Sequence, residues 1–285
     1  MRMQKAGLVG IFFFVACIAA CSHGPRLVKE TDLQKPTKVD SIVHKNVRTK
    51  VNRGSLPTSI AIIGITSSRV TSERGNGHNG YDPTGISHQV DRINDIRTTV
   101  DNVNDMKKFI SCRALDAAFD NMQASLESIG VHTVLATEEL EKDNYKRLLE
   151  YRGSPVCSAT KARVSMIKLL GVFMQAHRPG EGRGVIEYQQ ELQSLMSDLG
   201  VDGLLLGYLT TNQMKTNDSW LVILSKQPDG SVDAVWQGNL RHGRIKFQPV
   251  VKKPKNDDDK VKNVTRVYED SFKLLVAELA KDMKN

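Results

Sequence analysis

Cysteine is scarce in this chain of 285 residues, which contains only four. They form no CxxC pair and no cluster with histidines at zinc-binding spacing, which argues against a structural metal site. A Gly-x-Ser-x-Gly elbow is also missing, so the sequence carries no serine-hydrolase motif of that kind. The apolar stretch at residues 6–20 is too short to cross a bilayer as a helix. These absences leave no motif that predicts an enzyme or a bound cofactor.

The N-terminus has the layout of a secretory signal. Arg2 and Lys5 precede the apolar stretch, which ends in Ile18-Ala19-Ala20-Cys21. This ending resembles the lipobox of bacterial lipoproteins. The resemblance implies that Cys21 receives a diacylglycerol, that the chain is cut before it, and that the new amine is acylated. The alternative is an ordinary cleaved signal with a chance cysteine.

Ser22 follows the cysteine at the position where an inner-membrane retention signal would place Asp. The resemblance therefore implies an outer-membrane protein that is anchored through lipid on Cys21 and faces the periplasm. A multiply acylated cysteine is a durable anchor, because one acyl chain alone binds a membrane only marginally.

Positive charge is concentrated in two segments. Residues 22–55 contain eight Lys or Arg against three Asp or Glu, and residues 241–262 have the same counts. The rest of the mature chain is slightly acidic, so a uniformly basic nucleic-acid binder is excluded and no nucleic-acid partner is expected. Basic segments of this kind are attracted to anionic lipid headgroups or to acidic partner surfaces. The alternative is that both are solvated, flexible segments.

Cys17 lies in the signal and Cys21 at its end, which leaves Cys112 and Cys157. In an oxidising periplasm this remaining pair is a disulfide candidate. The alternative is two separately buried thiols.

Composition along the chain predicts three parts: a signal peptide at 1–20, a basic tether at 21–57 that contains three prolines, and one domain at 58–285. Residues 137–185 are less regular and are interpreted as an insertion in that domain.

Hydrophobic periodicity predicts helices and strands in alternating order. Helices are expected at residues 87–110, 114–129, 138–151, 186–199 and 264–283. Strands are expected at residues 59–65, 131–136, 201–209, 220–224 and 232–236, with a hairpin turn at 227–230. This order predicts an α/β fold with a mixed sheet, in which parallel strands are joined by a C-terminal antiparallel hairpin and flanked by helices.

The order of elements, together with the segments SIAIIGI and SDLGVDGLLLGYLTT, resembles the periplasmic lipoproteins of the CsgG, LpoB and TolB N-terminal-domain group. That resemblance implies non-catalytic work in the envelope, as an adaptor or regulator of cell-wall synthesis or secretion with an envelope protein as its partner. A CsgG-like secretion pore is an alternative, although no clear alternating hairpins of the membrane-inserting kind are present.

The Gly-rich loop after the first strand offers the one candidate site for other chemistry. His78 and His88 flank Asp82 there, so a histidine and a carboxylate could converge on a metal or a substrate. The simpler interpretation is a polar surface loop whose glycines permit positive φ. An envelope hydrolase or ligand binder that uses the His78–His88 loop is therefore an alternative function.

Overall fold

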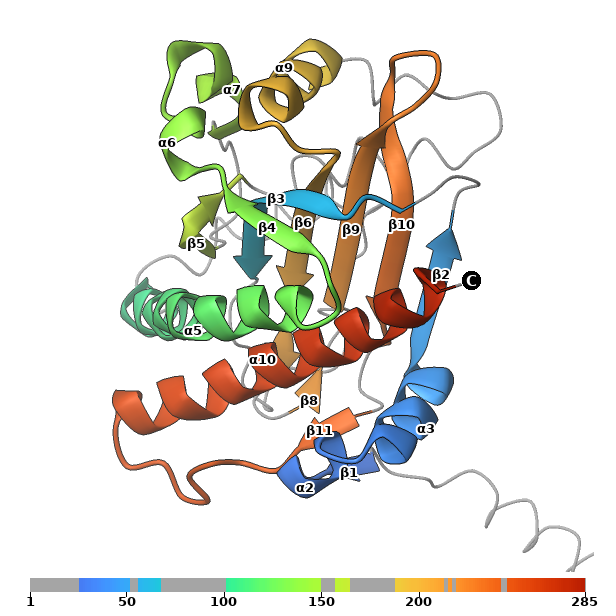
Figure 1. Cartoon of the computed structure of the whole chain (residues 1–285). Coiled ribbons are helices and arrows are strands. Elements are labelled where there is room, and N and C mark those ends of the chain that lie inside the picture. The colour runs from blue at the N-terminus through green and yellow to red at the C-terminus, as the bar shows by residue number, and fades with distance from the viewer. Residues whose placement is uncertain are drawn as a thin grey trace, which may run out of the picture.

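The structure is a computed structural model with an α/β fold, in which a mixed sheet is flanked by helices on both faces (Figure 1). This confirms the fold class that the sequence predicts. The structure describes residues 26–51, 56–67, 101–149, 157–164, 188–212, 215–216, 219–241 and 245–284.

The main sheet has the strand order β2-β10-β9-β6-β3-β4, and β5 also pairs with β3. β3 runs parallel to both β4 and β6, whereas β6, β9, β10 and β2 are successively antiparallel. The strands are β2 (Val47–Val51), β3 (Ser59–Ser67), β4 (His132–Leu135), β5 (Cys157–Arg163), β6 (Gly203–Leu209), β9 (Ser219–Lys226) and β10 (Val232–Leu240).

The central strands are apolar on both faces because each face supports its own core. Along β3, Ile60 and Ile62 belong to one cluster of buried side chains, whereas Ala61 and Ile63 belong to the other. β6 divides its leucines in the same way. This explains why both strands appear in the sequence as continuous apolar runs rather than as alternating ones.

One face of the sheet is covered by α5 (Asp101–Glu127), α10 (Asp257–Asp282) and α3 (Pro36–Asn46). The other is covered by α9 (Gln189–Leu199), α6 (Thr137–Leu140), the 3-10 turn η2 (Asp143–Tyr145) and α7 (Lys146–Leu149). Figure 1 shows α5 and α10 side by side across the first face, with α6, α7 and α9 at the opposite end of the molecule from α2 and β1.

Two of the predicted helices have different bounds. α5 continues through residues 111–113, where hydrophobic periodicity predicts a break between two helices, and residues 87–100 lie outside the described part of the chain. α10 begins seven residues before its predicted start, at Asp257. Asn256 caps it by accepting a hydrogen bond from the Asp259 amide, and three aspartates in the first turn complement the helix dipole.

The predicted tether at 21–57 is wrong for residues 26–51. They form β1 (Arg26–Val28), α2 (Glu30–Leu33), α3 and β2. The segment folds because its few apolar residues are concentrated: Ile42, Val43 and Val47 are buried in the core under α10, and β2 pairs with β10. Pro36 does not break α3, because it occupies the first turn, where a helix needs no amide donor.

The insertion predicted at 137–185 is likewise partly built into the sheet. β5 pairs antiparallel with the second half of β3, next to β4 on the same edge. The helix expected at 138–151 is instead divided into α6, η2 and α7. Residues 165–187 lie outside the described part of the chain.

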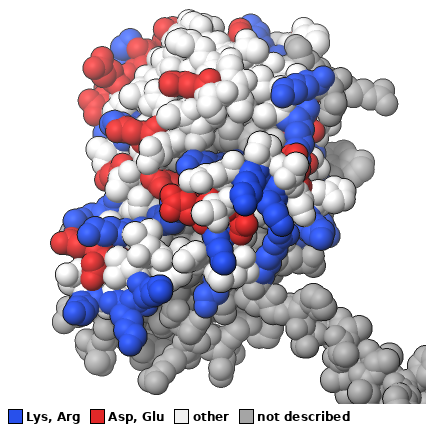
Figure 2. All heavy atoms as spheres, turned by 60° about the horizontal axis from the view of Figure 1, so that its bottom comes forward, with Lys and Arg blue, Asp and Glu red and all other residues white. Residues whose placement is uncertain are grey.

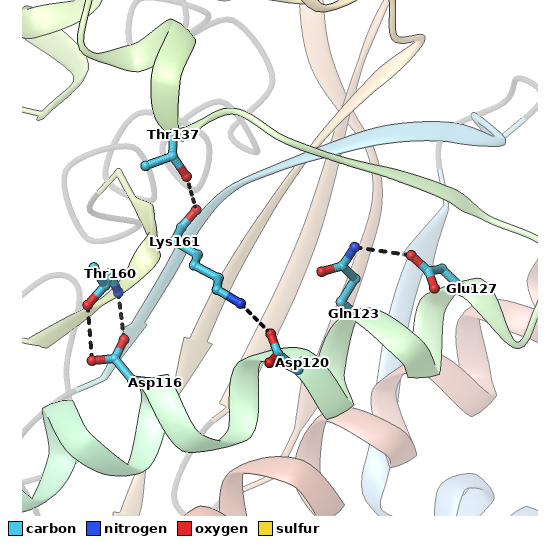
Figure 3. Close-up of polar contacts among 7 residues, drawn as sticks. All are labelled: Asp116, Asp120, Gln123, Glu127, Thr137, Thr160 and Lys161. Carbon is cyan, nitrogen blue, oxygen red and sulfur yellow. Dashed lines mark hydrogen bonds and ion pairs between the residues drawn. The ribbon is translucent and has the colours of Figure 1, made fainter.

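Three positions one turn apart on α5 fasten β5 to the helix. Cys112 forms a disulfide with Cys157. Asp116 accepts hydrogen bonds from the amide and the hydroxyl of Thr160, at 2.7 and 3.0 Å. Asp120 pairs with Lys161, whose Nζ lies 2.6 Å from Oδ1 (Figure 3). The disulfide therefore closes a loop that polar contacts also hold in place.

Replacing both cysteines, as Cys112→Ser with Cys157→Ser, should lower the free energy of unfolding by roughly 3–4 kcal/mol, because the unfolded chain regains the freedom of a 46-residue loop. Denaturant unfolding monitored by circular dichroism measures this difference. The matched control is dithiothreitol, which should destabilise the wild type by a similar amount and leave the double variant unchanged. Equal sensitivity of the two proteins to the reductant would contradict the prediction.

Candidate functional site

The two basic segments of the sequence meet at one end of the molecule. β1 pairs in parallel with β11 (Ile245–Phe247), so that Leu27 lies beside Lys246 and Val28 beside Phe247. The pairing is extended by the Gln248 amide, which donates to the carbonyl of Val28 at 2.9 Å. β11 in turn pairs with β8 (Lys215–Thr216), and β8 with β7 (Thr211–Asn212). Segments from opposite ends of the chain thereby share one small sheet.

The two sides of the β1–β11 pair differ in character. On the inner side, Val28, Ile245 and Phe247 are fully buried in the core. On the outer side, Leu27 is 49% exposed and Lys246 is exposed. The strand period of two places one apolar side chain and one cation next to each other on the surface.

The outer side continues into the loop that leads to α10. Val250 is 59% exposed, and Lys252, Lys253 and Lys255 are exposed as well. Lys29, which follows β1, is also exposed. We define the β1–β11 face as Leu27, Lys29, Lys246, Val250, Lys252, Lys253 and Lys255. Figure 2, in which this end is turned toward the viewer, shows Lys and Arg side chains in several groups with fewer acidic side chains between them.

Side chains of α10 hold the loop of this face, and Asn263 makes two of these contacts. Asn263, which is buried, accepts a hydrogen bond from the Val251 amide and donates one to the Val251 carbonyl, both at 2.9 Å. An amide side chain can satisfy both backbone groups of one residue in this way. Asn263 therefore fixes the backbone just before Lys252 and Lys253.

The acidic residues near the face have partners of their own. Asp257 pairs with Lys260 and Asp258 with Arg113, each at 2.8 Å. Asp259 accepts from the Lys255 amide at 3.0 Å. Within the part of the chain that the structure describes, no carboxylate forms an ion pair with a lysine of the β1–β11 face. The positive charge of the face is thus directed to solvent.

Beneath this end lies a buried carboxylate. Asp270 on α10 accepts a hydrogen bond from Arg266 Nε at 2.6 Å, and Arg266 also reaches Glu30 on α2 at 3.3 Å. Burial raises the pKa of Asp270 to about 6, although the positive charge of Arg266 acts in the opposite direction. The Arg266–Asp270 pair thereby connects the N-terminal helix to α10.

The raised pKa of Asp270 predicts a pH dependence. The Asp270 carboxylate binds a proton more tightly in the folded chain than in the unfolded chain, so lowering the pH from 8 to about 4 should favour the folded state. Relative to an Asp270→Asn variant, the wild type should gain roughly 2–3 kcal/mol of unfolding free energy over that range.

Urea unfolding of both proteins at several pH values measures the difference. Subtracting the variant removes the contribution of all other titrating groups. A difference that stays constant, or that shrinks as the pH falls, would contradict the prediction.

The structure brings together one pair of the residues singled out from the sequence, Cys112 and Cys157. Cys21 and the loop that contains His78, Asp82 and His88 lie outside the described residues. The basic excess at 22–55 and 241–262 is visible in the sequence, but the pairing that joins the two segments is not. β1 and β11 have three residues each, too few for a recognisable strand pattern.

Two shallow grooves occur elsewhere on the surface. One, of about 330 Å³, lies between the α2–α3 corner and the end of α10, and the other, of about 370 Å³, lies between α9 and β9. Among the described residues there is no group of three side chains suited to hold a metal ion, and no helix is both long and apolar enough to cross a membrane.

No protein-family model, curated protein or solved structure matches the chain.

Proposed function

We propose that this protein is a bacterial outer-membrane lipoprotein, anchored through lipid on Cys21 and facing the periplasm, that acts as a non-catalytic adaptor or regulator of an envelope assembly. The assembly would be of the cell-wall-synthesis or secretion type, as the resemblance to the CsgG, LpoB and TolB N-terminal-domain group implies. The observed mixed sheet between helices is compatible with that resemblance.

The observation that carries the proposal is the lipobox-like sequence at 18–21, together with the small number of residues between Cys21 and the first strand of the fold. Only residues 22–25 separate Cys21 from β1. The five steps along the chain from Cys21 to Arg26 span at most about 18 Å when fully extended. An anchored body would therefore lie close to the bilayer, with the end that carries β1 toward the membrane, instead of standing off on a long tether.

Such a placement suits an adaptor. The end that carries α6, α7 and α9 lies opposite β1 (Figure 1) and would face the periplasm. Its basic residues form local ion pairs, Lys142 with Glu139, Lys146 with Asp143, and Arg147 with Glu191. Acidic residues outnumber basic ones six to three in residues 137–149 and 189–199, so a partner that docks there would meet a surface with a net negative charge.

The anchor is tested by mass spectrometry of the protein from bacterial membranes. The wild type should begin at Cys21, carry diacylglycerol and an acyl chain, and partition into the detergent phase. Cys21→Ser should carry no lipid and remain in the aqueous phase. Cys17→Ser is the matched control, because it changes the other cysteine of the signal and should leave lipidation intact. An unlipidated wild type would refute the anchor.

The adaptor role is tested by crosslinking in intact cells, followed by identification of the captured proteins. We expect an envelope protein to be captured by the wild type, and much less of it by Cys21→Ser. A triple variant, His78→Ala with Asp82→Ala and His88→Ala, should capture the same partner and leave growth unchanged. Impaired growth of that triple variant, together with no captured partner in the wild type, would favour the hydrolase or ligand-binder alternative.

A further inference from the structure

We infer that the β1–β11 face docks on anionic phospholipid headgroups of the membrane that holds the chain. The inference rests on the proposed anchor for its orientation, but the surface itself is defined by described residues. It assigns to the two basic segments one shared ligand, a negatively charged bilayer surface.

The composition of the face matches a membrane interface. It contains five exposed lysines whose charges are directed to solvent. It also contains Leu27 and Val250, two of the four large hydrophobic side chains that are exposed among the described residues. Lysines next to exposed apolar side chains combine attraction to anionic headgroups with burial of apolar surface at the acyl boundary.

The face is also shaped before any ligand arrives. The β1–β11 pairing sets Leu27 beside Lys246, and the two hydrogen bonds from Asn263 hold Val251 between Val250 and Lys252. Binding therefore requires little ordering of the backbone, which lowers the entropic cost of docking.

The position of the face favours lipid over an acidic protein as its ligand. β1 is the first described element after Cys21, so a lipid on that cysteine keeps the start of β1 within about 18 Å of the anchor and turns this end of the molecule toward the membrane. Attraction to a charged surface fades over a Debye length of about 8 Å at physiological salt, so lysines elsewhere on the body would contribute less. The anchor would bring this one face within reach of the headgroups.

The test uses the proposed mature chain, residues 21–285 with Cys21→Ser, which keeps every described residue and removes the lipid. Binding is measured by co-sedimentation with vesicles of phosphatidylcholine, alone or with phosphatidylglycerol at about one third of the lipid. We expect at least tenfold tighter binding to the anionic vesicles, with the difference lost in high salt.

Two matched pairs of variants locate the binding surface. Lys252→Gln with Lys253→Gln and Lys255→Gln should weaken binding at least tenfold. The control, Lys142→Gln with Lys146→Gln and Lys226→Gln, removes the same charge at the opposite end and should change binding by less than twofold. Likewise Leu27→Ser with Val250→Ser should weaken binding severalfold without a change of charge, whereas Leu135→Ser should not.

Three outcomes would overturn the inference: equal binding to neutral and anionic vesicles, equal losses in the two lysine variants, or no vesicle binding by a protein that does bind polyglutamate. The last result would assign the face to an acidic protein. Lipidation is measured separately on the wild type, so failure of the proposed anchor can be distinguished from failure of the docking face. If the wild type from bacterial membranes carries no lipid but the Cys21→Ser chain binds anionic vesicles, the docking face is supported and the anchor is refuted. If the wild type is lipidated but the Cys21→Ser chain does not bind these vesicles, the anchor is supported and the docking face is refuted.

Discussion

The fold depends on the parallel pairing of β3 and β6, whose side chains point alternately into two separate cores. Every residue of these strands except Ser59 is buried, so neither strand could face water on either side. The pairing therefore requires helices on both faces. Gly64 in β3 allows the carbonyl of Val164 to approach more closely than any Cβ would permit, which joins the end of β5 to the same strand. The remaining elements are arranged around this pair.

α10 then joins the two ends of the chain. Its inner residues complete the core under the sheet, and Tyr268 reaches the buried hydroxyl of Ser111 on α5. Two polar residues of its first half organise the basic end: Asn263 holds the loop before Lys252, and Arg266 pairs with Glu30 of α2. One helix thus supports both the core and the proposed docking face, and the N-terminal segment is part of the body because α10 covers it.

The predictable features are those that recur over many residues. The strands at β3, β4, β6, β9 and β10 and the helices α9 and α10 follow from long apolar patterns and from turn residues such as Gly200. The N-terminal elements could not be predicted in this way. Their buried residues, Val28, Ile42, Val43 and Val47, are few and irregularly spaced, and they fold only against surfaces that the rest of the chain supplies. Prolines and positive charge in the same segment have the composition of a linker, although in α3 the proline begins a helix.

By itself, the sequence determined the α/β class, the basic excess in two segments, and the candidate disulfide and lipidation cysteines, because composition, periodicity and short motifs are local properties. Tertiary structure alone decided that residues 26–51 belong to the folded body and that β1 meets β11. Both depend on contacts between residues at opposite ends of the chain, whose pairing energy comes from burial of Val28, Ile245 and Phe247 in a core that no local segment contains. The positive charges of the two basic segments can therefore be counted in the sequence, whereas their assembly into one surface is a consequence of the fold.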